Sequence, residues 1–188
     1  MEIEETALPE VKLIKPQKYG DARGFFSEVW SDRELKSAGI TADFVQDNHA
    51  FSAEKGTIRG LHYQMPPKAQ GKLVRVIRGK ALDVAVDIRR GSKNFGKHVA
   101  VVLSAENWHQ LWVPPGFAHG YCTLTTNVEF LYKVTNDYSP EHGQGLLWND
   151  PAIGINWKIS EADIILSDKD KILPLLADQE NLFEFGEC

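Results

Sequence analysis

Short segments with a two-residue hydrophobic period are the feature that most constrains the fold of this 188-residue chain. The clearest is residues 82–89, which read LDVAVDIR and alternate aliphatic side chains with two aspartates, an alanine and an arginine. Successive side chains of a strand point to opposite faces, so this pattern predicts one apolar and one mostly polar face. Residues 99–103 repeat the same period.

Further segments carry the β-branched and aromatic residues typical of strands: residues 24–29, 44–49, 57–64, 72–77, 110–113, 120–123 and 128–135. Fifteen glycines and nine prolines are spread among them. We therefore predict one all-β domain over residues 1–188, with two sheets packed as a sandwich or barrel.

Helical signals are few. Ser31, with Glu34 three residues later, has the pattern of a capping box, and Gly39 is a stop signal, so a short N-terminal helix is expected between them. A partly helical C-terminal tail is expected after Ser160.

Composition excludes several classes of function. The net charge of −5 and the pI near 5.7 argue against a nucleic-acid binder, which usually carries a basic surplus. Residues 1–16 contain four glutamates and no long apolar run, so neither a signal peptide nor a membrane segment is expected, and we predict a cytoplasmic protein. Cys122 and Cys188 lack the spacing of a zinc or redox motif and are expected to be plain thiols.

Two histidine motifs indicate a particular sandwich. Residues 56–79 have the frame of the first cupin motif, in which Gly56 is followed by five residues and then His62, and Gly79 closes the segment. Residues 114–119 read PPGFAH, match the second motif and end in His119. Together they resemble the cupin jelly roll, a β-sandwich whose mouth holds small ligands.

The metal ligands of this frame are missing. Where metal-binding cupins have a second histidine and a glutamate, this sequence has Gln64 and Lys72. A lysine ammonium has no lone pair and repels a divalent ion, so no metal is expected. Inside a barrel Lys72 needs an anionic partner, and an oxyanion or phosphate meets that need.

His62 and Tyr132 then describe a different site. Strand periodicity puts His62 and Gln64 on one face of their strand, as it does Phe130, Tyr132 and Val134 on theirs. Histidine is a base near neutral pH, and tyrosine can return a proton to the opposite side of a planar intermediate, which suits epimerisation. Taken alone, each residue is more often a packed core residue.

Longer motifs narrow the resemblance. They read DARGFFSE at 21–28, FVQDNH at 44–49, IRGLHYQ at 58–64, AQGKLV at 69–74, ALDVAVDIR at 81–89, QLWVPPGFAHG at 110–120, EFLYKVTNDYSP at 129–140 and WNDPAIGINW at 148–157. In this order they resemble the dTDP-4-dehydrorhamnose 3,5-epimerase family over nearly the whole chain. The resemblance implies a jelly-roll homodimer without metal or organic cofactor, acting on dTDP-4-dehydro-6-deoxy-D-glucose in dTDP-L-rhamnose synthesis.

The resemblance also implies catalytic roles. His62 would be the base, Tyr132 the proton donor, Lys72 the group that stabilises the enolate, and Asp170 the carboxylate that orients His62. The chemistry agrees, because protons beside a ketone become removable when negative charge on the carbonyl oxygen is stabilised. The segment before Lys169 is one residue longer than usual in the family, so Asp168 is an alternative to Asp170.

The residues that the resemblance places around the ligand are Arg23, Glu28, Gln46, Asp47, Asn48, Arg59, Lys72, His119, Tyr138, Glu141 and Lys169. Tyr138 would stack on the thymine, and the arginines suit a diphosphate because their planar fork donates two parallel hydrogen bonds. A family glutamate that follows YSP falls on Glu141 or is absent.

Three alternatives stay open at this point. An epimerase acting only at C3 or C5 would share the base and the fold, although Tyr132 favours the double epimerase. Gln64 and Lys72 argue against a metal-dependent cupin enzyme. A non-catalytic sugar-binding module would not need His62 and Tyr132 together.

Overall fold

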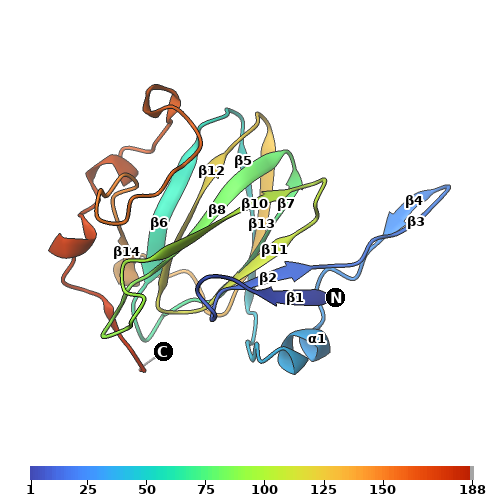
Figure 1. Ribbon diagram of the computed structural model, residues 1–188, viewed down its shortest axis with the longest axis horizontal. Coiled ribbons are helices and arrows are strands. Elements are labelled where there is room, and N and C mark those ends of the chain that lie inside the picture. Colours follow the sequence, from blue (N-terminus) through green and yellow to red (C-terminus); the bar gives the residue numbers. More distant parts are fainter. Residues whose placement is uncertain (187–188) are drawn as a thin grey trace.

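Two antiparallel sheets face each other in the computed structural model, which describes residues 1–186 (Figure 1). The larger has the order β1 (Glu2–Glu5), β2 (Lys12–Lys15), β11 (Gln110–Val113), β7 (Lys72–Arg78), β13 (Val128–Val134) and β5 (Gln46–Ser52). The smaller has the order β10 (His98–Ser104), β8 (Lys80–Asp87), β12 (Phe117–Thr123), β6 (Ile58–Gln64) and β14 (Gly143–Gly145). Consecutive strands β6, β7 and β8 alternate between the sheets, which confirms the predicted all-β sandwich. Cys188 lies outside the described residues, and Cys122 is a buried free thiol.

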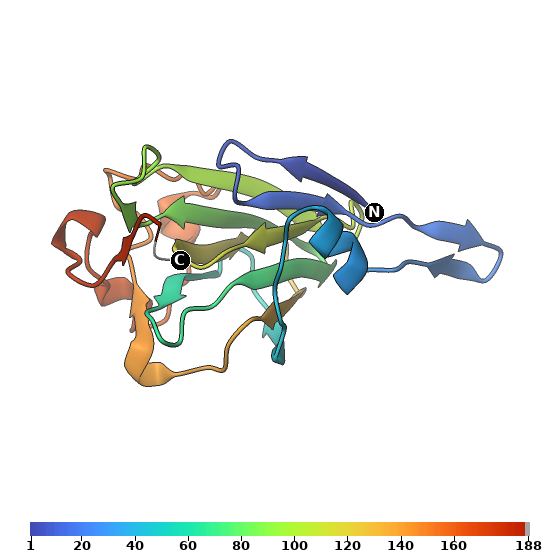
Figure 2. The same cartoon turned by 90° about the horizontal axis from the view of Figure 1, so that it is seen from below.

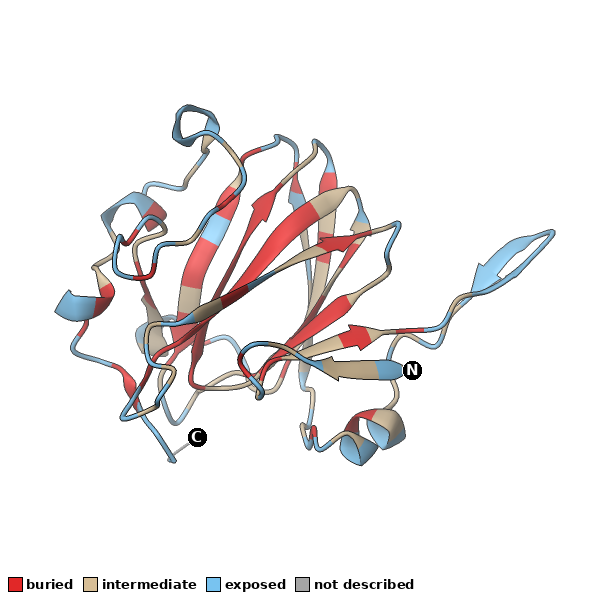
Figure 3. Ribbon diagram, viewed as in Figure 1, coloured by how far each residue is buried: buried red, intermediate tan, exposed pale blue. Residues whose placement is uncertain are grey.

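Strand β8 has the predicted apolar and mostly polar faces, and both of them are buried (Figure 3). On one face, Ala85 packs between the sheets against Phe130. On the other face, Val84 and its aliphatic neighbours pack under Trp157 and Phe183 of the C-terminal segment. The strand alternates as predicted. The local pattern could not show that the C-terminal segment, which is distant in sequence, covers its aliphatic face.

The single α-helix of the described residues, α1 (Asp32–Ser37), lies between Ser31 and Gly39 as predicted. The capping box was wrong, because the Ser31 side chain makes no cap hydrogen bond. Its carbonyl instead accepts the N–H of Leu35. Gly39 has φ of +79°, the left-handed conformation that ends helices.

The remaining helices are single 3₁₀ turns. They are η1 (Pro140–His142), η2 (Glu161–Asp163), η3 (Asp170–Ile172) and η4 (Leu176–Asp178). The C-terminal tail is therefore helical only in short turns, and it ends with β15 (Phe183–Glu184) paired in parallel with β9 (Arg89–Arg90). The tail runs along the outer side of the smaller sheet (Figures 1 and 2).

An arm made of β3 (Tyr19–Asp21) and β4 (Gly24–Phe26) projects away from the sandwich (Figures 1 and 2). The predicted strand at residues 24–29 is thus limited to three residues outside both sheets. Phe25 and Phe26 are exposed on the arm. At its base the Lys18 ammonium lies 4.7 Å from the ring of Phe25 and 4.3 Å from that of Trp108. These cation–π contacts anchor a hairpin whose own aromatic side chains are uncovered.

A glycine contact shapes the strand that carries His62. Gly60 has φ of +121°, and a Cβ there would lie 2.6 Å from the Cα of Gly120 on β12. The register between β6 and β12 shifts at this point, pairing His119 with His62 but Tyr121 with Arg59. A regular strand would send Arg59 and His62 to opposite faces, whereas here both line one cavity.

We expect Gly60→Ala to lower the free energy of unfolding by about 2 kcal/mol or more, because the new methyl group must push β6 away from β12 in a strained backbone. Thermal denaturation should show a decrease in Tm of roughly 4 to 8 °C. Gly20→Ala on the arm is the control, since its Cβ meets only one atom at 3.7 Å. Equal Tm values for the two variants would contradict the close approach of the strands.

Candidate active site

A cavity of about 490 Å³ lies between the sheets and is closed on one side by the C-terminal tail. Its walls come from β5, β6, β7, β12, β13 and residues 165–170. The polar or titratable side chains that line it are Thr57, Arg59, His62, Lys72, His119, Tyr121, Tyr132, Ser167, Lys169 and Asp170. Residues predicted from four separate sequence motifs thus meet in one space.

His62 is held by a carboxylate from the tail. Its Nε2 lies 2.6 Å from Oδ1 of Asp170, which is buried at the start of η3. Burial raises the pKa of Asp170. Hydrogen bonds from His62, Ser167 and the Gly60 N–H have the larger opposite effect, so the net pKa lies below the ordinary value. An ionised Asp170 accepts a hydrogen bond from the Nε2–H of His62, and in that tautomer the lone pair of Nδ1 is available to take a proton.

The neighbouring Asp168 does not compete for this place. Its side chain is 99% exposed, and its carboxylate accepts a hydrogen bond from Lys171 at 2.8 Å. Of the two aspartates that the sequence left open, the structure brings Asp170 to His62.

Tyr132 stands on the opposite wall from His62. It belongs to β13 of the larger sheet, whereas His62 belongs to β6 of the smaller sheet, and both side chains line the cavity. Burial raises the pKa of the Tyr132 phenol, an effect that Arg59 partly offsets. The phenol therefore keeps its proton at neutral pH and can donate it to a ligand from the side opposite His62.

Lys72 extends from β7 into the same space, and its ammonium donates to the carbonyl oxygen of His62 at 3.3 Å. Burial lowers the pKa of Lys72 to about 8, and the charge of Asp83 opposes that shift. On β12 of the smaller sheet, Nε2 of His119 lies 3.0 Å from Oδ2 of Asp83. The cavity thus brings the Lys72 ammonium close to His62, while His62 and His119 are each bonded to an aspartate.

Known proteins are similar to this chain in sequence and fold. The family model described as dTDP-4-dehydrorhamnose 3,5-epimerase matches residues 5–178. An enzyme of that name from Sinorhizobium fredii is 50% identical over 185 residues, which are 98% of this chain and 94% of that protein. A crystal structure of the 3,5-epimerase from Legionella pneumophila, in complex with dTDP-4-keto-L-rhamnose, has 45% identity and a TM-score of 0.93, with 98% of both chains covered.

The chain belongs to the dTDP-4-dehydrorhamnose 3,5-epimerase family. A further relative, the enzyme of Salmonella typhimurium, is 52% identical over 180 residues, 95% of this chain and 97% of that one. The expected cupin-type jelly roll is confirmed by these solved epimerase structures. Membership in this epimerase family excludes two of the alternatives for the function of the chain, a metal-dependent cupin enzyme and a non-catalytic sugar-binding module.

Several residues expected around the ligand adjoin the epimerase cavity. Arg59 and Lys169 line it. Gln46 and Asn48 lie on the same face of β5, joined by a hydrogen bond of 2.8 Å, and the Tyr138 N–H donates to Oε1 of Gln46 at 3.2 Å. The Asn48 backbone is paired with that of Tyr132. These three residues therefore form the rim on the Tyr132 side.

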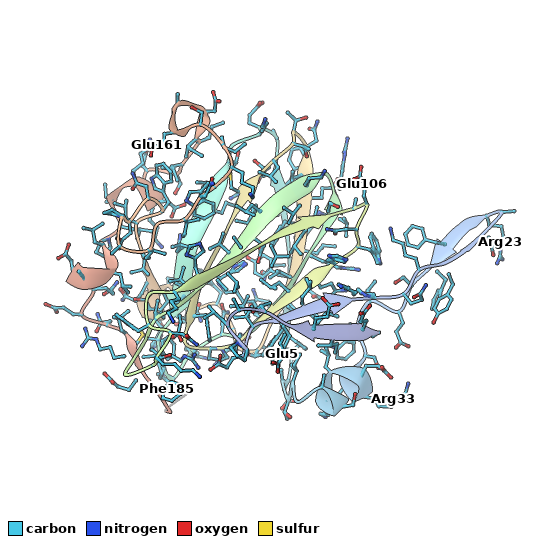
Figure 4. All side chains as sticks on the ribbon, in the orientation of Figure 1. Glu5, Arg23, Arg33, Glu106, Glu161 and Phe185 are labelled. Carbon is cyan, nitrogen blue, oxygen red and sulfur yellow. The ribbon has the colours of Figure 1, made fainter. Side chains whose placement is uncertain are left out.

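Four other expected residues do not reach the cavity of their own chain. Asp47 points to the other face of β5, where it accepts a salt bridge from Lys133 at 2.8 Å. Glu141 is exposed on η1. Arg23 and Glu28 belong to the arm and the segment just after it, and Arg23 stands at the arm tip with 90% of its side chain exposed (Figure 4). A resemblance by sequence motif cannot tell whether a residue serves its own site or that of another copy.

Gln64, at the place of a cupin metal ligand, has a structural task in this epimerase. Its amide nitrogen donates to the carbonyl of Lys68 at 2.6 Å, and its oxygen accepts the Ser139 N–H at 2.9 Å. Within residues 1–186 no cluster of three or more histidine, cysteine or acidic side chains is arranged to hold a metal ion. Nor is any helix in that range long and apolar enough to cross a membrane.

Sequence reasoning missed Asp83, Tyr121 and Ser167. Asp83 was predicted only to lie on the mostly polar face of its strand, and Tyr121 follows the second cupin motif without any charge or spacing to mark it. Ser167 could have been noticed as a hydroxyl three residues before Asp170, whose N–H donates to it at 3.2 Å.

Asp170→Asn should lower kcat by roughly 10²- to 10⁴-fold with little change in KM, because the amide keeps the shape but no longer stabilises a protonated His62. Steady-state kinetics on the keto sugar would measure this. Asp168→Asn is the matched control and should stay within about twofold of the wild type, since an exposed ion pair contributes little. A larger loss in Asp168→Asn than in Asp170→Asn would refute the assignment.

Proposed function

We propose that this epimerase inverts C3 and C5 of dTDP-4-dehydro-6-deoxy-D-glucose to give dTDP-4-dehydro-L-rhamnose, in the synthesis of dTDP-L-rhamnose. The observation that carries the proposal is the placement of His62 and Tyr132 on opposite walls of one cavity, with Lys72 beside them. The complex of the Legionella relative with dTDP-4-keto-L-rhamnose supports the choice of sugar.

The chemistry follows from this placement. His62 removes the proton from a carbon beside the C4 ketone, and the electron pair moves to the carbonyl oxygen, where the Lys72 ammonium stabilises the enolate. Asp170 stabilises the imidazolium that forms. Tyr132 then gives a proton to the other face of the carbon, which inverts it. Because C3 and C5 both flank C4, one enolate-stabilising group serves both inversions.

The nucleotide part of the substrate needs cations and a ring contact outside the reacting centre. Arg59 and Lys169 line the cavity and supply two positive charges for a diphosphate. Tyr138 is exposed at the rim, held by its backbone to Gln46, and offers its ring to a thymine. These contacts would bind the dTDP group while the sugar lies between His62 and Tyr132.

We further propose a homodimer in which the arm of one copy reaches the cavity of the other. Arg23 and Glu28 match the family motif around the ligand, yet neither lines the cavity of its own chain. Arg23 stands on the projecting arm (Figure 4). The arm also exposes Tyr19, Phe25 and Phe26, apolar surface that a second copy would cover.

The purified protein should exchange the C3 and C5 protons of the keto sugar with deuterium from heavy water, as observed by NMR. His62→Ala should lower the exchange rate at both carbons by roughly 10²- to 10⁴-fold, since one base serves both. Tyr132→Phe should slow formation of the inverted product more than loss of the original proton, because it removes the acid and leaves the base.

Exchange at one carbon only would identify a single-position epimerase, and exchange at neither would overturn the proposed reaction. Full activity in His62→Ala would remove that residue from the mechanism.

The arm proposal has its own test. Arg23→Ala and His62→Ala subunits, each poorly active alone, should complement each other when they are mixed, unfolded and refolded together. Half of the dimers would be mixed, and one site in each would combine an intact His62 with an intact arm, so activity should reach about one quarter of the wild-type value. Activity no higher than the mean of the two separate variants would show that Arg23 serves its own chain or no site.

A further inference from the structure

The floor of the cavity carries a second histidine–aspartate pair. Asp83 is 0% exposed, and both of its carboxylate oxygens lie 3.0 to 3.1 Å from Nε2 of His119. In the register between β12 and β6, His119 is directly opposite His62. Two histidines on neighbouring strands thus face one ligand space, and each is held by its own carboxylate.

Asp87 on the same strand shows what is unusual about Asp83. Both aspartates are fully buried, four residues apart, on the same face of β8. Asp87 is neutralised by Arg89 at 2.7 Å and accepts a hydrogen bond from Ser92, an arrangement within the core. Asp83 has no such arginine, and its hydrogen-bond partner is a histidine that lines the cavity. A buried carboxylate needs compensation, so the groups near Asp83 must supply it.

Lys72 is the cation whose charge acts on Asp83. The titratable groups that line the cavity with it are Arg59, His62, His119, Tyr121, Tyr132, Lys169 and Asp170. Asp170 is the one carboxylate among these described residues, and it is engaged with His62 at 2.6 Å. Burial lowers the pKa of Lys72, and the group that opposes this shift is Asp83. Burial likewise raises the pKa of Asp83, and His119 and Lys72 lower it in part.

We propose that Asp83 is a positioning residue, which fixes the ring of His119 and serves as the countercharge that keeps the Lys72 ammonium protonated in front of the ligand's oxyanion. The proposal rests on the proposed function, because it concerns the group that stabilises the enolate. It assigns a task to a residue that is fully buried and does not line the cavity.

The direction of the pH effect follows. Lys72 stabilises an oxyanion only as the ammonium, so this contribution is present below its pKa of about 8 and is lost as the pH rises through that value. If Asp83 loses its charge, the pKa of Lys72 falls further, by about one unit for the removal of a nearby opposite charge. The loss of activity then begins at lower pH.

The test is the pH dependence of kcat/KM for the wild type and Asp83→Asn, which keeps the shape of the side chain and removes the charge. At pH 8 the protonated fraction of Lys72 should fall from about one half to about one tenth, so kcat/KM should fall roughly fivefold relative to the wild type. At pH 6 Lys72 is protonated in both proteins and the two values should converge. A ratio that does not change with pH would overturn the proposal and leave Asp83 a packing role.

Asp87→Asn is the matched control, equally buried on the same strand but paired with Arg89. It should decrease thermal stability without changing the pH profile of the folded enzyme. A shift in the profile of Asp87→Asn equal to that of Asp83→Asn would contradict a specific role of Asp83.

Competitive labelling of Lys72 with acetic anhydride, quantified by peptide mass spectrometry, measures its titration without any catalytic assay. The labelling midpoint should fall in Asp83→Asn, and an unchanged midpoint would overturn the countercharge. If the wild type is inactive on the keto sugar but the labelling midpoint of Lys72 still falls in Asp83→Asn, the proposed reaction is disproved and the role of Asp83 as a countercharge stands. If Asp83→Asn does not fold, the double variant Lys72→Met/Asp83→Asn is compared with Lys72→Met by thermal denaturation. The two should have the same Tm, because Asp83 then has no ammonium to balance. A lower Tm of the double variant would also refute the pairing.

Discussion

The hydrogen bond between His62 and Asp170 is the contact on which the rest of the site depends. It joins residues 108 positions apart and connects the sandwich to the C-terminal tail. The same tail covers the aliphatic face of β8 with Trp157 and Phe183, so one segment completes both the hydrophobic core and the cavity. Asp170 is held by hydrogen bonds that involve His62, Ser167 and the Gly60 backbone, and each bond to a charged group contributes roughly 1.5 to 3 kcal/mol net.

The sandwich architecture explains why acid and base lie on opposite sides of a ligand. His62 comes from the smaller sheet and Tyr132 from the larger, and the ligand space is the gap between the two sheets. Two groups that reach the cavity from one strand would lie on the same side of the ligand and could only add and remove protons from that side. Two facing sheets place side chains on both sides of the space between them, which is what inversion of a carbon needs. The irregularity at Gly60 also brings Arg59 to the wall that carries His62.

Much of this arrangement could be predicted from local patterns. Alternation located the central strands, and the replacement of metal ligands by Gln64 and Lys72 indicated an anion site. The patterns failed where the answer depends on a distant segment. Alternation in β8 could not show that the tail covers its aliphatic face, and so it could not show that the mostly polar face with Asp83 is also buried. The choice between Asp168 and Asp170 depended on the path of the tail, which no local pattern describes.

The replacement of a metal by a lysine has a consequence for regulation of the site by pH. A divalent ion keeps its charge over the whole range in which its ligands stay deprotonated, whereas the charge of a buried ammonium depends on its surroundings. Burial alone destabilises the Lys72 ammonium, and a carboxylate placed directly in the cavity would compete with the substrate for it. Asp83, behind the cavity wall and bonded to His119, can support the positive charge without occupying the place of the oxyanion. For the proposed enolate stabilisation by Lys72, a negative charge outside the ligand space is better placed than one inside it, and Asp83 on the buried strand β8 has such a position.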